Sequence, residues 1–250
     1  MFWMGPNECL WSVRCFVKFE RQLAVLNPSV CSRNSLVILP TTQYDTKIQD
    51  FIQNNSFQIT KKDPTNNFQS QIRKSINNSK TLIPHDTKWR YTNMNPSGPT
   101  IKGLIKIHKP EQPIRPIVNW RNAPAYNLAN LLTCEIKRLA PPPYTYNVNN
   151  TTDLINELRN TQTYPHYGLA SLDISNLYTN IPVTETRDII ANMLEHQLDP
   201  QTRKKLLEWY DVITRQNYFS NNGEILIQKG GLAMGAPTSG ILAEIFLQHL

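Results

Sequence analysis

The sequence has few cysteines and glycines, and it has no long hydrophobic run. Its 4 cysteines form no C-x-x-C pair, and no cysteine or histidine has the spacing of a zinc site. Reduced thiols in an intracellular protein are therefore expected. No apolar run approaches the roughly 18 residues that a membrane span needs. The first residues also lack the basic and apolar regions of a secretory signal, so we expect no targeting signal and no membrane partner.

Positive charge and proline are what the chain has in excess. Lys and Arg number 26 against 19 Asp and Glu, a net charge of +7 over 250 residues, and 18 prolines stand against 9 glycines. Hydrophobic residues at 40% and charged residues at 18% exclude a disordered chain. The length allows one large domain or two modest ones. The charge favours a polyanionic partner, although many basic proteins bind none.

Hydrophobic periodicity predicts short strands and amphipathic helices in alternation, and residues 1–34 are expected to form an irregular extension. A buried strand is predicted at 35–39, and further strands at 101–108, 117–119 and 168–174. Helices are predicted around Ile72 and Ile136, after a cap at Thr152 or Asp153, after Pro182, after Asp199-Pro200 and from near Thr238. Asn222-Gly223 predicts a two-residue hairpin turn.

An acidic residue ends an apolar segment in SLDISNLYTNIP, residues 171–182. A buried, unpaired carboxylate is costly, whereas a carboxylate at the mouth of a strand can hold a divalent cation. Tyr178 follows Asp173 after a turn and could place an aromatic wall over whatever the metal binds. Spacing alone favours the plainer interpretation, in which Asp173 caps the next turn and Tyr178 belongs to the core.

A glycine-rich turn follows the predicted hairpin in QKGGLAMGAPTSGILAEIF, residues 228–246. Glycines let a backbone approach a flat or phosphorylated ligand closely, and the N-terminus of the following helix favours anions. Taken alone, the segment is equally explained as a tight connection between a strand and a helix.

A basic ribbon occupies residues 101–121, where isoleucines first alternate with lysine or histidine as in a strand with one basic face. Glu111 is its single acid, against Lys102, Lys106, Lys109, Arg115 and Arg121. Such a ribbon can clamp phosphates, with the lysines as point charges and Arg115 as a fork. A solvated strand face explains the same pattern about as well.

In this order, the three segments resemble the reverse transcriptase of Penelope-like retroelements, over about residues 35–250. SLVILP, KKDPT and GLIKIHKPEQPIRPIVN are similar to that family's fingers. SLDISNLYTNIP is similar to its catalytic motif A (171–182), and the glycine-rich segment to its motif B (228–246). Ile105 stands where the family usually has proline. The two motifs at this separation are far more specific together than either is alone.

The resemblance implies an α+β right-hand polymerase fold with fingers and an incomplete palm, whose function is RNA-directed DNA synthesis. Residues 35–165 would form the fingers-like region and 166–250 the partial palm. The implied partners are an RNA template, a DNA primer and deoxynucleoside triphosphates, with two Mg²⁺ ions as cofactor. The implied location is the nucleus, as for other retroelement polymerases.

The roles of single residues follow from the same resemblance. Asp173 would be the catalytic metal ligand, Ile174 would offer its backbone carbonyl to the second metal, and Tyr178 would exclude a ribose 2′-OH. Arg115, with Lys106 or Lys109, would hold the incoming triphosphate. The other implied contacts with the nucleotide, the nascent base pair and the template are Gln228, Gly231, Met234, Gly235, Ala236 and Pro237.

One departure from the family concerns the metal site. The family completes it with adjacent aspartates in a Y-x-D-D hairpin after motif B, and no Asp-Asp pair occurs in this chain, which stops inside the motif B helix. Because two-metal catalysis needs those carboxylates, we expect the chain by itself not to polymerise. The alternative function is a non-catalytic, nucleic-acid-binding remnant of a reverse transcriptase. A protein with a chance basic ribbon is disfavoured by the two ordered motifs.

Overall fold

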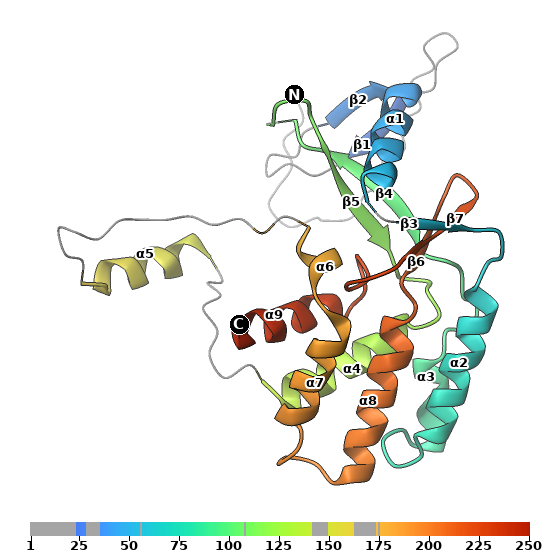
Figure 1. Cartoon of the computed structure of the whole chain (residues 1–250), viewed down its shortest axis with the longest axis vertical. Helices are drawn as coiled ribbons and strands as arrows, with labels where there is room; N and C mark the ends of the chain where they lie inside the picture. Colours follow the sequence, from blue (N-terminus) through green and yellow to red (C-terminus); the bar gives the residue numbers. More distant parts are fainter. Residues whose placement is uncertain are drawn as a thin grey trace, which may run out of the picture. The chain divides into compact units, whose positions relative to one another are not determined.

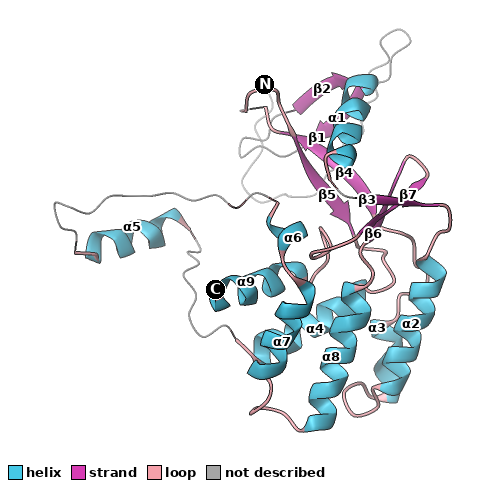
Figure 2. Ribbon diagram, viewed as in Figure 1, coloured by secondary structure: helices cyan, strands magenta, loops and turns pink. Residues whose placement is uncertain are grey.

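The computed structural model describes residues 24–28, 36–55, 57–107, 109–141, 150–162, 174 and 176–250. These residues form an α+β structure (Figure 2). The chain divides into two compact units. Unit 1 holds the described residues up to 55 together with Lys102–Ile117, and unit 2 holds Phe57–Ile101 with the described residues from Val118 to Leu250. Within the described ranges, no helix is long and apolar enough to cross a membrane.

The strands form two sheets, which Figure 1 labels along the chain. The first pairs two strands antiparallel, and the second is a mixed sheet in the order β3-β7-β6-β4-β5. β4 meets β6 in parallel at Thr100 and Ser220, while β7 pairs antiparallel with both β3 and β6. The strands are β1 (Ala24–Pro28), β2 (Leu36–Pro40), β3 (Phe57–Thr60), β4 (Thr100–Ile105), β5 (Ile114–Asn119), β6 (Tyr218–Asn221) and β7 (Glu224–Gln228).

The helices of unit 2 surround most of the buried apolar side chains, and in Figure 1 α7 and α8 run side by side. Predicted helical stripes are confirmed in α2, where Ile72 and Ile76 are buried, and in α4, where Leu132 and Ile136 are buried. The helices are α1 (Thr41–Gln53), α2 (Thr65–Asn78), α3 (Lys88–Tyr91), α4 (Tyr126–Leu139), α5 (Thr151–Asn160), α6 (Leu177–Asn180), α7 (Val183–Met193), α8 (Pro200–Thr214) and α9 (Ser239–His249), with a 3₁₀ turn at His85–Thr87.

Two local predictions near the site are confirmed in detail. Asp199 caps α8, because its carboxylate accepts hydrogen bonds of 3.0 Å from the backbone N–H groups of Gln201 and Thr202. The β6–β7 turn has φ 47° at Asn222 and 87° at Gly223, the positive values that a two-residue hairpin turn requires. These elements fix the strand that leads into motif B.

Other predictions were wrong or lie outside the described residues. β1 falls within the segment expected to be irregular, because a strand's pairing partner stabilises it even where its own pattern is weak. β2 forms as predicted but is not fully buried: Ile38 is 62% exposed in a sheet of only two strands. α5 is capped by Asn150, which accepts from the Asp153 N–H, rather than by Thr152 or Asp153. Of the strand predicted at 168–174, only Ile174 is described.

Candidate functional site

The end of motif A lies directly against the glycine turn of motif B. The backbone N–H of Leu232 donates to the carbonyl oxygen of Tyr178 across 2.6 Å. Tyr178 lies in α6, and Leu232 follows β7, so residues far apart in sequence meet within unit 2. The structure therefore brings together two segments that the sequence singled out separately.

Two glycines make this close approach possible. Gly231 has φ 70°, and a Cβ there would collide with the carbonyl oxygens of Thr179 and Tyr178. Gly235 has φ 80°, and a Cβ there would collide with the carbonyl oxygen of Val118 at the end of β5. Both the left-handed backbone and the lack of space require glycine. The backbone of motif B thus packs against motif A on one side and against β5 on the other.

Tyr178 is not a core residue, because its side chain is 40% exposed. Asn176 precedes α6 with φ 52°, a left-handed conformation that asparagine tolerates and that turns the chain sharply before Tyr178. Ile174 is also exposed. Asp173 lies outside the described residues, so its predicted role as a metal ligand stays a prediction. An exposed aromatic ring at this position is compatible with a contact to a ligand.

Buried amide side chains hold the motif B turn in place. The Nε2 of Gln228 donates to the carbonyl oxygens of Gly230 and Leu232 at 2.6 and 3.0 Å, and the Nδ2 of Asn217 donates to that of Gly231 at 3.2 Å. Gln228 was predicted to touch the nucleotide, and the structure gives it this supporting position. Asn217 was not predicted at all, since nothing in its local sequence distinguishes it from an ordinary loop asparagine.

The rest of motif B leads into α9. Ser239 at the start of that helix donates its hydroxyl to the Ala233 carbonyl at 2.6 Å, which fixes the loop between them. Along this loop, Met234 and Pro237 are half-buried, Gly235 is exposed and Ala236 is buried. The Ala236 N–H donates to the Ala233 carbonyl at 3.3 Å, so this buried residue supports the loop.

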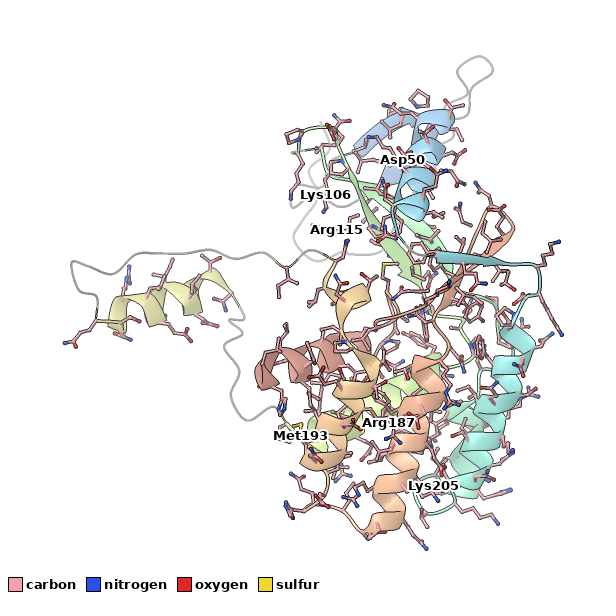
Figure 3. The ribbon with its side chains drawn as sticks, viewed as in Figure 1. Asp50, Lys106, Arg115, Arg187, Met193 and Lys205 are labelled. Atoms are coloured by element: carbon pink, nitrogen blue, oxygen red, sulfur yellow. The ribbon has the colours of Figure 1, made fainter. Side chains whose placement is uncertain are left out.

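The basic ribbon runs through β4, the connection after it and β5 (Figure 3), and the part that carries Lys102, Lys106, Lys109 and Arg115 belongs to unit 1. The Lys106 N–H donates to the Pro113 carbonyl at 2.9 Å, and Lys47 of α1 donates through Nζ to the Glu111 carbonyl at 2.8 Å. Lys102, Lys109 and Arg115 are exposed and Lys106 is half-buried. Among the described residues, no carboxylate pairs with any of these four cations. Their charges are available to a phosphate-bearing partner.

No metal centre is visible in the part of the chain that the structure describes. There, no group of three His, Cys, Asp or Glu side chains lies close enough to hold an ion. Asp173 is outside that part, and the only other predicted ligand is the backbone carbonyl of Ile174. The described residues therefore do not by themselves complete a two-metal site.

An ion pair and a tyrosine hold α7 against α8. Arg187 donates to both oxygens of Asp211 at 2.7 and 3.2 Å, and this hydrogen bond raises the pKa of the guanidinium (Figure 3). Tyr210 donates its hydroxyl to the Val183 carbonyl at 2.7 Å, and burial raises the pKa of the phenol. The first turn of α7, immediately after motif A, is thereby fixed in position.

A cavity of about 470 Å³ opens beside the motif B turn, entirely within unit 2. It lies between the start of α7, the end of α8 and the end of β7. Its lining residues are Pro182, Val183, Thr184, Thr214, Arg215, Asn217, Gln228, Lys229, Gly230 and Gly231.

The chain matches no family model and, at a significant level, no curated protein.

Proposed function

We propose that this chain is the fingers and the first part of the palm of a reverse transcriptase similar to those of Penelope-like retroelements, and that it binds a template–primer. The observation that carries the proposal is the 2.6 Å hydrogen bond between Leu232 and Tyr178. Motifs A and B must lie side by side to flank one nucleotide, and these two segments do so. The requirement for glycine at position 231 supports the proposal, because a Cβ there would collide with the carbonyl oxygens of Thr179 and Tyr178 at the end of motif A.

In this proposal the basic ribbon grips the nucleic-acid backbone and the triphosphate. The ribbon supplies four positive charges, from Lys102 in β4, Lys106 and Lys109 in the connection, and Arg115 in β5, and no described carboxylate forms an ion pair with them. Phosphate contacts of this kind give affinity without sequence preference, as a polymerase needs.

Two further roles complete the proposal. Asp173 and the Ile174 carbonyl would each contribute a ligand to Mg²⁺, and the two-metal chemistry of a polymerase would need further carboxylates beside them. Tyr178 would lie under the sugar of the incoming nucleotide and leave no room for a 2′-OH. Its exposed ring is in keeping with that role.

A salt-dependent binding measurement tests the proposal. We expect the chain to bind an RNA–DNA hybrid with an affinity that falls steeply with salt, and changing all four ribbon cations to Gln to reduce the slope of log K against log salt by roughly 3 to 4. The matched control changes Arg73, Lys74, Lys80 and Lys204, four exposed cations of unit 2 with the same composition. Binding that is absent, or equally salt-dependent in both variants, would refute the phosphate clamp.

A further inference from the structure

Two exposed surfaces of unit 2 carry apolar side chains together with charges of opposite sign, and we propose that they bind each other between two copies of this chain. The first, the α3 surface, consists of Lys88, Trp89, Arg90 and Met94. The second, the α5 stripe, consists of Leu154, Ile155 and Leu158. This inference is independent of the proposed function, which leaves both surfaces unused.

The α3 surface exposes two large apolar side chains beside two cations. Trp89 is 65% exposed and Met94 is 73% exposed. The guanidinium carbon of Arg90 lies 5.5 Å from the centre of the Trp89 ring, and Lys88 directly precedes that tryptophan. Neither cation forms an ion pair among the described residues. Tryptophan, methionine and arginine are enriched where proteins bind one another, so this composition is typical of a protein–protein interface.

Hydrogen bonds fix the backbone of the α3 surface. The Thr92 N–H donates to the Trp89 carbonyl at 3.4 Å, and the Thr92 hydroxyl donates to the Lys88 carbonyl at 3.2 Å. The Gln69 side chain donates to the Asn93 carbonyl at 2.6 Å, which ties the end of this segment to α2. Because the backbone is already held in place, little of its conformational entropy is lost on association.

The charge around α3 is positive. Between residues 65 and 100 the chain has five Lys and Arg and a single acid, Asp86. This charge attracts a partner with acidic side chains. Nucleic acid is the alternative partner, but single strands bind by stacking successive bases on aromatic rings, and Arg90 already lies over Trp89, the one ring of the α3 surface. The exposed apolar side chains favour a partner that has apolar side chains of its own.

The α5 stripe is an apolar helix face that no described residue buries. Leu154, Ile155 and Leu158 lie on one face of the helix by their spacing, and they are 40% to 55% exposed. A helix of 10 residues is marginal in water by itself, and packing of its apolar face is what normally stabilises it. The stripe therefore gains stability from any surface that covers it.

Acidic side chains flank the α5 stripe. Asp153 and Glu157 are four residues apart, so they lie on the same flank. Asp153 accepts a hydrogen bond of 2.9 Å from the Asn150 side chain, and neither acid forms an ion pair with a described cation. Arg159 is the only cation of the helix. Apolar side chains edged by acids complement the α3 surface, where apolar side chains are edged by cations.

A contact between two copies would join the α3 surface of one to the α5 stripe of the other. Both surfaces are exposed in the described structure, so neither covers the other within one copy. The contact joins two different surfaces, so it is heterologous and can repeat from copy to copy in a ring or an open chain. If one copy lost the first surface and another lost the second, a single complementary pair would remain.

The test removes each surface separately and then mixes the two variants. Trp89→Ser with Arg90→Glu removes the α3 surface, and Leu154→Ser with Leu158→Ser removes the α5 stripe. The matched control, Ile38→Ser with Ile59→Ser, removes two other exposed apolar side chains. Sedimentation velocity of nuclease-treated protein, over a wide range of concentration and at two salt concentrations, measures the mass of the species formed.

We expect the wild type and the control to associate, and the association constant of each surface variant by itself to be at least about tenfold lower. An equimolar mixture of the two variants should regain association but form dimers and nothing larger, because only one intact pair remains. Misfolding of either variant cannot produce this recovery. Association of the wild type should weaken as salt rises, since salt screens the attraction between the acids and the cations.

The other outcomes contradict the proposal in different ways. A wild type that stays monomeric shows that the surfaces do not join two copies. If one variant still associates with itself, the surface that it retains pairs with its own kind. If mixing the variants restores nothing, the α3 surface and the α5 stripe are not partners. If association is unchanged in every variant but Trp89→Ser with Arg90→Glu binds single-stranded RNA more weakly, the α3 surface binds nucleic acid instead.

Discussion

Single residues determine whether motifs A and B can meet. Gly231 must be glycine for two independent reasons, a positive φ of 70° and a collision of any Cβ with the carbonyls of Thr179 and Tyr178. Its neighbour Gly230 has neither constraint, because a Cβ there meets nothing within 4 Å. The pair offers a matched comparison in which one methyl group is added at two adjacent positions.

Gly231→Ala should therefore lower the free energy of unfolding by roughly 2–4 kcal/mol, from backbone strain together with overpacking. Gly230→Ala should change it by less than about 0.5 kcal/mol. Urea unfolding of both variants and the wild type checks this. Similar stabilities for the two variants would show that the Gly231–Thr179 contact does not exist in solution.

The exposed ring of Tyr178 is predicted to act on substrate choice rather than on stability. In a version of the chain extended by the Y-x-D-D hairpin, Tyr178→Ala should raise the ratio of kcat/KM for ribonucleotides over deoxynucleotides by about tenfold or more, equivalent to about 1.4 kcal/mol. The unfolding midpoint should hardly move, since the ring is 40% exposed. An unchanged ratio with a lowered midpoint would make Tyr178 a structural residue.

At the scale of elements, α7 and α8 act as one support for the end of motif A. Arg187 and Asp211 are joined by two hydrogen bonds, but their side chains are 34% and 31% exposed. Solvent therefore screens the ion pair. We expect Arg187→Gln to lower the free energy of unfolding by about 1 kcal/mol. Lys205→Gln, which breaks the pair with Glu208 inside α8, should cost less than about 0.5 kcal/mol. Thermal unfolding of the two variants would separate these effects.

A second link between elements depends on pH. Tyr218 of β6 is buried and shares a 2.8 Å hydrogen bond with Thr65 of α2, and burial raises the pKa of its phenol to about 12. The folded-state pKa lies above the ordinary value of about 10. The buried, protonated phenol therefore contributes fully to the free energy of unfolding below pH 10, and this contribution is lost as the pH rises from about 10 to 12. Tyr218→Phe should flatten that part of the curve of unfolding free energy against pH. Parallel curves for the two proteins would contradict the burial of the phenol.

Elements with local signals could be predicted from sequence, and those that depend on a distant partner could not. Asp199-Pro200 begins α8, and Asn222-Gly223 forms the hairpin turn, because caps and tight turns are determined by neighbouring residues. β1 was missed since its stability comes from pairing with β2. Segments 171–182 and 228–246 were singled out from the sequence, but the hydrogen bond that joins them, from Leu232 to Tyr178, was not predicted. Nor was the amide of Asn217 that supports them, because its carbonyl partner at Gly231 is reached only in the folded chain.

At the scale of the whole molecule, the proposed function predicts binding of nucleic acid without catalysis by these 250 residues alone. No Asp-Asp pair occurs in the 250 residues. We expect the purified chain to bind template–primer and to incorporate no deoxynucleotide in a primer-extension assay, because two-metal catalysis needs further carboxylates. Template-dependent incorporation that disappears in Asp173→Ala would contradict this expectation.

The discontinuous make-up of the two units limits how the chain can be recombined with related proteins. Unit 1 takes one segment from the start of the chain and a second, Lys102–Ile117, from its middle, so β4 and β5 each begin in one unit and end in the other. A chimaera that exchanges only the first segment would place a foreign α1 against the native ribbon. It would therefore lose the hydrogen bond that the Tyr44 hydroxyl accepts from the Gly103 N–H and the one that Lys47 donates to the Glu111 carbonyl, unless Tyr44 and Lys47 were both kept. A chimaera that folds must therefore exchange both segments of unit 1 together. For the same reason, we expect recombination between related genes to keep the two segments from one parent.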